Sequence, residues 1–229
     1  MSPFVKLSFW VVGVIGALGV LAGCSPSTPQ IIQDFTRLTY LVDPGSTLPK
    51  ETLSVFIQVE NKDGLEDLEK LYILNDKDEV YWTLEPGLWQ RRDKGTEIWI
   101  GSNFLTSPLG EIPRGEYRIL LQSKSGDRAR TKFFLDSPKL ADYQKLLPQV
   151  LVDGDGVTIV NPPVSYELWL ASSDGQPVYT YRSPGESRIL KQTFLPTPDV
   201  QQRARQLTLH RFEDRLGVSL ILGPYPIAP

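Results

Sequence analysis

Proline and glycine interrupt this chain so often that long helices have little room. The 229 residues include 19 prolines and 18 glycines, and the stretches between them are short and rich in β-branched and aromatic residues. Short runs of this kind, separated by turn-forming residues, are typical of all-β proteins. The chain has a single cysteine, Cys24, so no disulfide can form within it and the core alone must hold the fold.

An apolar run opens the chain. It follows Lys6, covers residues 7–22 and ends in Leu21-Ala22-Gly23-Cys24. A basic flank, an apolar stretch and small residues before a cleavage point are typical of a secretory signal peptide. The alternative is a membrane-spanning helix, but residues 7–22 would reach only about 24 Å, less than a hydrocarbon core of about 30 Å.

Leu21-Ala22-Gly23-Cys24 resembles the lipobox of bacterial lipoproteins. The resemblance implies cleavage before Cys24, diacylglycerol on its sulfur and a fatty acid on its new amino group. We therefore expect a signal peptide over residues 1–23, then a lipidated, flexible tether over residues 24–33 that binds the chain to a membrane. Ser25 follows the cysteine in place of an aspartate, which by the sorting pattern of many Gram-negative lipoproteins favours the outer membrane.

Residues 34–136 show the alternation of a β-sandwich. Leu53, Val55 and Ile57, for example, share one face of a predicted strand. Gly115 and Tyr117 at the start of a later strand resemble the tyrosine corner of fibronectin type III and other immunoglobulin-like domains. That resemblance implies a sandwich of about seven strands in about 100 residues and implies nothing about activity.

Residues 149–229 repeat part of this pattern. The set Asp76, Val80, Tyr81, Pro86 and Gly87 recurs at the same spacing as Asp174, Val178, Tyr179, Pro184 and Gly185. The fold we predict is two tandem immunoglobulin-like or fibronectin III-like sandwiches, the second more divergent; chance similarity between strand-rich segments is the alternative.

Two short helices are predicted as well. Leu140, Tyr143, Leu146 and Leu147 recur at helical spacing, which predicts a linker helix over residues 137–148 between the two sandwiches. Thr197 before Pro198 is a helix-capping pair, and it predicts a helix that runs through Arg203.

No motif points to catalysis, a metal or nucleic acid. The formal net charge is −3 and no basic cluster stands out, which argues against nucleic-acid binding. His210 is the only histidine; it is out of phase with Leu207 and Leu209, so we expect it to face solvent, and no nucleophile elbow accompanies it. Asp153-Gly154-Asp155-Gly156 could begin a calcium loop, but the distal ligands are missing and a hairpin turn is favoured. We expect no enzyme activity, no metal and no cofactor beyond the lipid on Cys24.

Two sets of side chains are candidates for binding a partner. Trp89 and Trp99 are the better surface candidates among the tryptophans of the first sandwich, and they could stack on sugars or anchor a protein; the alternative, which we favour for Trp82, is that the rings complete the core. The second set lies on the strand phase that should face water: Tyr72, Leu74, Leu120 and Phe134. An apolar outer face needs a cover, either the linker helix or the second domain, which is the favoured alternative, or a protein partner.

These observations favour a non-enzymatic, exported lipoprotein that presents β-sandwich modules for binding or assembly at the cell envelope. Its expected partners are a membrane, through the lipid, and a protein. Two alternatives stay open. One is an envelope glycan hydrolase with carboxylates near Trp89 and Trp99, and the other is a purely structural spacer.

Overall fold

The computed structural model describes residues 27–46, 49–143 and 147–228. The predicted signal peptide, Cys24 and the first residues of the tether lie outside this range. Strands dominate the described residues, which confirms the predicted all-β class. Among them, no helix is long and apolar enough to cross a membrane.

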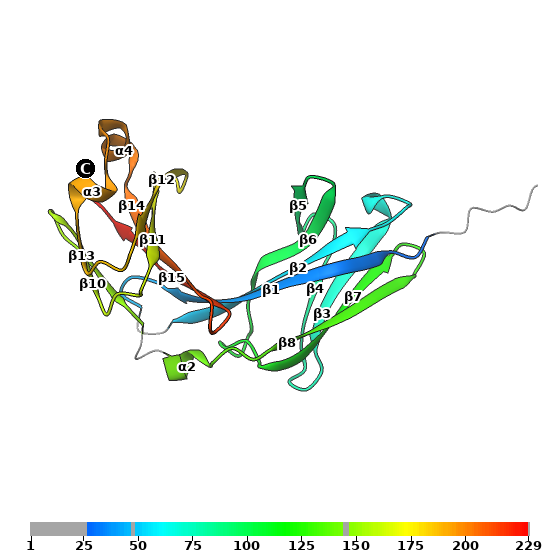
Figure 1. Cartoon of the computed structure of the whole chain (residues 1–229). Helices are drawn as coiled ribbons and strands as arrows, with labels where there is room; N and C mark the ends of the chain where they lie inside the picture. The colour runs from blue at the N-terminus through cyan, green and yellow to red at the C-terminus, as the bar shows by residue number, and fades with distance from the viewer. Residues whose placement is uncertain (1–26, 47–48, 144–146, 229) are drawn as a thin grey trace, which may run out of the picture.

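The strands form two units along the chain (Figure 1). The first unit contains β1 (Gln30–Val42), β2 (Lys50–Glu60), β3 (Leu68–Asn75), β4 (Val80–Leu84), β5 (Gln90–Lys94), β6 (Glu97–Leu105), β7 (Gly115–Ser123) and β8 (Arg128–Leu135). The second contains β9 (Gln149–Val152), β10 (Gly156–Val160), β11 (Tyr166–Ala171), β12 (Pro177–Ser183), β13 (Arg188–Leu190), β14 (Gln206–Glu213) and β15 (Val218–Pro226). The helical segments are short: η1 (Leu65–Asp67), α2 (Leu140–Tyr143), α3 (Lys191–Phe194) and α4 (Pro198–Arg203).

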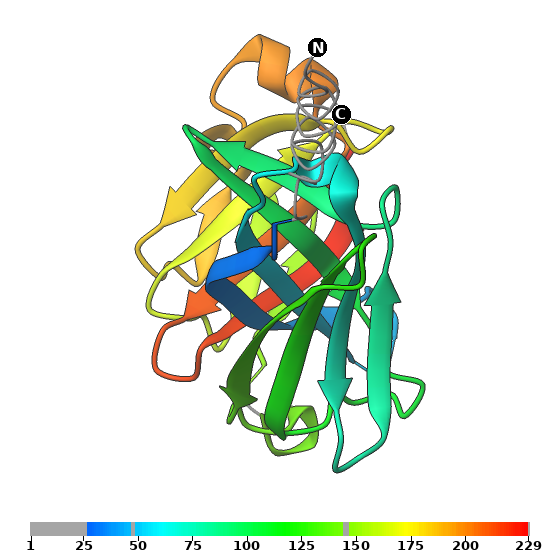
Figure 2. The ribbon, with the colours of Figure 1, turned by 90° about the vertical axis from the view of Figure 1, so that its right-hand side faces the viewer.

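The first unit is a sandwich in which the sheet β4-β3-β7-β8 packs against β1-β2-β6-β5. Figure 2 shows the two layers, with the blue β1 behind the four-stranded sheet. The alternation places Leu53, Val55 and Ile57 of β2 in the core, where none of the three is exposed. Tyr117 is also fully buried, and its hydroxyl donates to the Pro113 carbonyl at 2.7 Å, which is the hydrogen bond of a tyrosine corner.

The second unit repeats the pairing of the first. The order β12-β11-β14-β15 corresponds to β4-β3-β7-β8, and β13-β10-β9 corresponds to β6-β2-β1. Every one of these pairs is antiparallel in both units. The repeat seen in the sequence therefore has a counterpart in strand order.

The two units share one sheet, which the sequence pattern did not predict. The second half of β1 pairs in parallel with β15, from Leu38 opposite Val218 to Val42 opposite Leu222. This joins the units into one eight-stranded sheet with the order β12-β11-β14-β15-β1-β2-β6-β5. The predicted join was a helix over residues 137–148; the described helix, α2, covers only Leu140–Tyr143, and residues 144–146 lie outside the described range.

The three-stranded and four-stranded sheets pack on the same face of the eight-stranded sheet. Leu38 and Tyr40 of β1 are fully buried, as are the inward residues Val218 and Leu220 that lie opposite them on β15. The alternate residues of these strands therefore point to the other side. No described sheet or helix packs on that side as a second layer, and we call it the open face (Figure 1).

Part of the predicted tether is ordered structure. β1 begins at Gln30, inside the range 24–33 expected to be flexible. Ahead of the strand, the Ser27 N–H donates to Asp63 Oδ2 at 2.5 Å. This contact, together with the pairing of Gln30 with Glu60 and of Ile31 with Val59, fixes the start of β1 against β2 and the loop after it.

Candidate functional site

The open face gathers aromatic and charged side chains from both units. Because Leu38 and Tyr40 point into the core, Phe35 and Arg37 of β1 point to the open face. In the same way Leu207 and Leu209 of β14 are buried, and the next outward residues are His210 and Phe212. The remaining members are Glu167 and Trp169 of β11 and Arg182 of β12, which follow from the register Glu167–His210 and Glu167–Arg182.

Arg37 lies between two phenyl rings at the join of the two units. Its guanidinium carbon is 4.9 Å from the centre of the Phe35 ring and 4.3 Å from the centre of the Phe212 ring. Both distances fall within the range of cation–π attraction. The Arg37 guanidinium makes no hydrogen bond and no ion pair with any residue that the structure describes. Its N–H groups are therefore held in place by the rings and remain unpaired.

Trp169 forms a second ordered aromatic group on this face. Its ring stacks on the His210 imidazole, with centroids 4.2 Å apart and an interplanar angle of 21°. The indole Nε1 donates to Glu167 Oε2 at 2.8 Å, while Arg182 Nε donates to Glu167 Oε1 at 3.0 Å. Trp169 is still 39% exposed, so an oriented aromatic surface is left open to solvent.

The charges around Trp169 balance. The hydrogen bond from Trp169 is the main cause that lowers the pKa of Glu167, and Arg182 adds to it. Burial lowers the pKa of His210; the Glu167 carboxylate opposes this effect, and the Arg37 cation adds to it. At neutral pH the imidazole is therefore uncharged and Glu167 is ionised, with Arg182 as its ion-pair partner at 3.0 Å.

A cavity opens beside these groups. It has a volume of about 300 Å³ and is lined by Glu167, Arg182, His210 and Phe212, together with Arg211 and residues at the strand ends. Arg211 donates through one terminal nitrogen to the carbonyl and hydroxyl oxygens of Ser165, both at 2.6 Å. Its Nε is buried and has no hydrogen-bond partner among the described residues. The lining therefore combines arginine donors with the carboxylates of Glu167 and Asp214.

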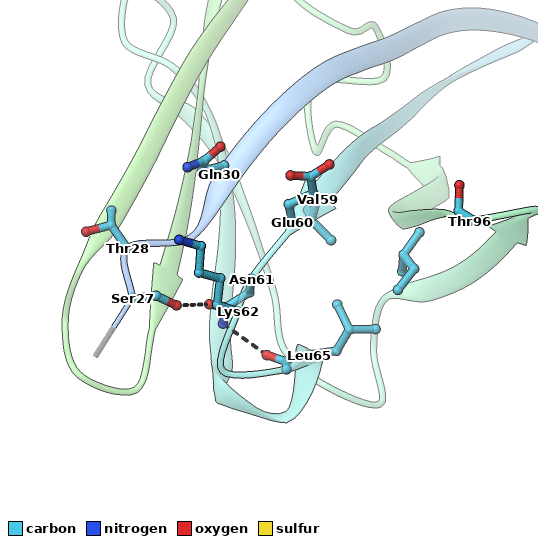
Figure 3. A pocket seen from close by; sticks show the side chains of 11 residues that line it. Ser27, Thr28, Gln30, Val59, Glu60, Asn61, Lys62, Leu65 and Thr96 are labelled. Carbon is cyan, nitrogen blue, oxygen red and sulfur yellow. Dashed lines mark hydrogen bonds between the residues drawn. The ribbon is translucent and has the colours of Figure 1, made fainter. Parts of the chain in front are cut away.

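A larger cavity of about 610 Å³ lies at the other end of the first unit, where β1 begins (Figure 3). Val59, Leu65 and Ile98 supply its apolar lining. At its edge the Ser27 hydroxyl donates to Asn61 Oδ1 at 3.0 Å. The lining combines aliphatic groups with isolated polar ones and assembles no catalytic group of residues, so we place the candidate site on the open face.

The structure separates the two tryptophans predicted as surface candidates. Trp99 lies in β6 opposite Gln58, which points outward from β2, so its ring is on the open face. It is half-buried, and its Nε1 donates to Glu97 Oε2 at 3.0 Å. Trp89 is partly buried and packs against the core, as Trp82 does. Only Trp99 therefore belongs to the candidate site.

The predicted apolar outer patch lies on the far side of the first unit. Tyr72 is directly opposite Leu120 on the outer face of the four-stranded sheet. Tyr72, Leu74 and Leu120 are half-buried, but Phe134 is 68% exposed. Neither α2 nor the second unit buries Phe134, but it lines a cavity of about 300 Å³ together with Arg37 of β1 and Gly217 before β15. Tyr72, Leu74 and Leu120 stay on the outer face of the four-stranded sheet.

Asp153-Gly154-Asp155-Gly156 forms the turn between β9 and β10. Asp153 Oδ1 accepts hydrogen bonds from the N–H groups of Asp155 and Gly156, both at 2.9 Å, and Arg188 pairs with the same carboxylate at 2.6 Å. Throughout the described residues, no group of three or more His, Cys, Asp or Glu side chains could hold a metal ion.

Sequence reasoning missed Arg37, Phe212 and Trp169 as a group. Their strand phases can be extrapolated from the sequence, since Arg37, Trp169 and Phe212 are out of phase with the apolar residues Leu38, Leu168 and Leu209 of the same strands. Their proximity depends on the pairing of β1 with β15, which places residues from the two ends of the chain on neighbouring strands.

Comparisons with known proteins give no family for this chain. No family model matches it, and no curated protein matches it. Among the matching solved structures is Tp47, the 47-kilodalton lipoprotein of Treponema pallidum, with 13% sequence identity and a TM-score of 0.40. The match covers 87% of this chain and 51% of that chain, so this chain spans about half the length of that protein.

Proposed function

We propose that this protein is a lipid-anchored envelope protein without catalytic activity that presents the open face of its eight-stranded sheet as a binding surface. One observation carries the proposal: β1 and β15 join two sandwiches into a single sheet, and both smaller sheets pack on the same side of it. The other side is therefore formed by strands of both units. The resemblance of Leu21-Ala22-Gly23-Cys24 to a lipobox supplies the anchor.

The surface is preorganised, which favours binding because little conformational entropy is lost when a ligand is held. Arg37 is positioned by two rings, and Trp169 by a stack and a hydrogen bond. The buried pair of Glu51 and Arg114, 2.7 Å apart, fixes the segment that leads from the first unit to the second.

The position of the surface suits an anchored protein. The start of β1, which follows the predicted tether, lies at the far end of the first unit from β11, β12 and β14 (Figure 1). The group around Trp169 is therefore at the opposite end of the molecule from the start of β1 (Figure 1).

The anchor is tested with the full chain in a bacterial host that processes lipoproteins. We expect the unsubstituted chain to incorporate an alkyne-tagged fatty acid and to enter the detergent phase, and Cys24→Ser to stay unlabelled and uncleaved. A Cys24→Ser chain that is processed and partitions like the parent would contradict the lipid anchor.

The binding surface is tested in the same cells with a photo-crosslinking amino acid in place of Phe35 on the open face. The matched control carries it in place of Tyr81, which is 69% exposed and lies opposite Leu74 on the outer face of the four-stranded sheet. We expect a discrete envelope product from position 35 and none from position 81. Equal products from both positions, or none from position 35, would contradict a binding role for the open face.

A further inference from the structure

The unpaired guanidinium of Arg37 indicates the chemistry of the ligand. Phe35 and Phe212 each lie against the group, with ring centres 4.9 and 4.3 Å from its central carbon. A guanidinium packed against rings in this way still has N–H donors along its edge, and that edge matches the two oxygens of a carboxylate. Because Arg37 has no acceptor among the described residues, it retains this capacity for a ligand.

Neither nearby acid supplies that carboxylate: Asp136, which lines a cavity of about 300 Å³ together with Arg37 and Arg215, makes no ion pair with Arg37 among the described residues, and Glu167 is engaged by other partners. Glu167 already accepts hydrogen bonds from Trp169 and Arg182, and its Oε2 lies 3.8 Å from His210 Nδ1. The pairing of Glu167 with Arg182 leaves Arg37 as the uncompensated cation within this group of residues. Charge complementarity therefore favours an acidic ligand over a neutral or basic one.

Trp169 indicates the second property of the ligand. An indole that is 39% exposed and fixed from below by His210 offers a flat apolar surface surrounded by hydrogen-bonding groups. The C–H face of a sugar ring, with its hydroxyl groups at the edge, matches such a surface. A lipid chain would need a continuous apolar groove, whereas Thr39 and Ser219 occupy neighbouring outward positions on β1 and β15. An extended peptide would add to a strand edge and not to a sheet face.

The separation of the two groups sets the size of the ligand. The Trp169 ring lies 4.2 Å from the His210 ring and the Arg37 guanidinium 4.3 Å from the Phe212 ring, and both of these partners lie on β14, two residues apart. Two residues along a strand span about 7 Å. This spacing exceeds a single sugar ring and suits a short oligosaccharide that runs along β14.

We infer that the open face binds an acidic glycan, with the Arg37 guanidinium taking a carboxylate and the Trp169 ring stacking on a sugar a short distance along the chain. This inference rests on the proposed function, because it names the ligand class of the same surface. The cavity beside Phe212 is lined by Arg182 and Arg211 and also by Glu167 and Asp214, so it would receive hydroxyl groups of the same ligand.

The test is calorimetric titration of the full chain in a detergent without a sugar head group. The acidic probe is a hyaluronan hexasaccharide, in which glucuronate alternates with N-acetylglucosamine, and the neutral probe is chitohexaose. We expect the acidic probe to bind at least about tenfold more tightly, since a charge-assisted hydrogen-bond pair carries this much discrimination. No binding of the acidic probe at millimolar concentration, or equal binding of both probes, would overturn the inference.

Substitutions assign the binding to the two residues. Arg37→Gln should weaken the acidic probe at least about tenfold and leave chitohexaose unchanged, and Arg37→Lys should recover only part of the loss because an ammonium lacks the planar fork. Trp169→Ala should weaken both probes by about fivefold. The control is Arg130→Gln, the same charge change on the outer face of the four-stranded sheet, which should alter neither titration.

The thermal unfolding transition of each variant is first compared with that of the parent chain. If Arg37→Gln does not fold, the titrations of Arg37→Lys and Trp169→Ala decide the outcome. Binding of the acidic probe that none of the folded variants changes would place the ligand elsewhere and overturn the inference. Crosslinking from position 35 distinguishes the two proposals. If an envelope protein is captured from this position but the acidic probe does not bind, the acidic glycan is refuted as the ligand and the binding role of the open face still stands.

Discussion

At the scale of single residues, one buried carboxylate ties together segments that are distant in sequence. The Glu51 side chain is fully buried and accepts hydrogen bonds from both terminal nitrogens of Arg114, at 2.8 and 2.7 Å. It also accepts the N–H groups of Ile112 and Leu140, at 2.8 and 3.1 Å. Burial alone would lower the pKa of Arg114, but the hydrogen bond and charge of Glu51 raise it overall. The Glu51 carboxylate of β2 therefore holds both the segment before β7, through Ile112 and Arg114, and the start of α2, through Leu140.

Replacing this carboxylate should be costly. Glu51→Gln leaves the Arg114 charge buried without its partner, and we expect the free energy of unfolding in urea to fall by about 3–5 kcal/mol. The control is Asp43→Asn, which removes an exposed pair with Lys50 at 2.9 Å and should cost less than about 1 kcal/mol. Equal losses in the two variants would show that the buried pair has no special role.

At the scale of elements, the turn between β9 and β10 carries the clearest electrostatic signature. Hydrogen bonds from Arg188, Asp155 and Gly156 lower the pKa of Asp153 to about 2. Arg188 begins β13, so the carboxylate holds the three strands of the smaller sheet at one end. A carboxyl whose pKa is lower in the folded chain stabilises the fold above its unfolded pKa of about 4 and loses that contribution as the pH falls.

This interaction predicts a pH dependence. The free energy of unfolding of the parent chain should decline between about pH 4 and about pH 2 more steeply than that of Asp153→Asn. Arg188→Gln removes the hydrogen-bond donor that contributes most to the lowered pKa of Asp153. The free energy of unfolding of this variant should therefore also depend less steeply on pH than that of the parent chain. Chemical denaturation at a series of pH values measures both effects, and parent-like slopes in both variants would refute the assignment.

At the scale of the whole molecule, the parallel pairing of β1 with β15 decides the architecture. Thr39 lies opposite Ser219 in this pairing, and both are small and buried. The pairing makes the two units one sheet and brings Arg37 against Phe212. Without it, the two halves of the open face would be separate surfaces.

The register of this pairing can be tested by crosslinking. Neighbouring strands place opposed Cα atoms about 5 Å apart, within the range that a disulfide spans. The double variant Thr39→Cys with Ser219→Cys should therefore crosslink on mild oxidation, as seen by peptide mapping. Thr39→Cys with Ile221→Cys is out of register by two residues, about 8 Å apart, and should not. Crosslinking of the second pair alone would refute the join.

Local patterns predicted many of the elements. The strand expected around Leu53, Val55 and Ile57 is part of β2, and the helix expected after Thr197 is α4, where the Thr197 hydroxyl accepts the N–H of Val200. These predictions hold because alternation and capping act within a few residues. β5 was missed, since Arg91, Arg92 and Asp93 lie on an edge strand exposed on both sides and show no alternation.

The sequence by itself determined the β class, the phase of most strands and the leader that resembles a lipobox, because each depends on neighbouring residues. Only the tertiary structure decided that β1 has β15 as its second partner, that both smaller sheets pack on one side, and that Arg37 lies between Phe35 and Phe212. The physical reason is that side-chain alternation records which residues face the core, whereas strand pairing uses backbone N–H and C=O groups that are alike in nearly every residue.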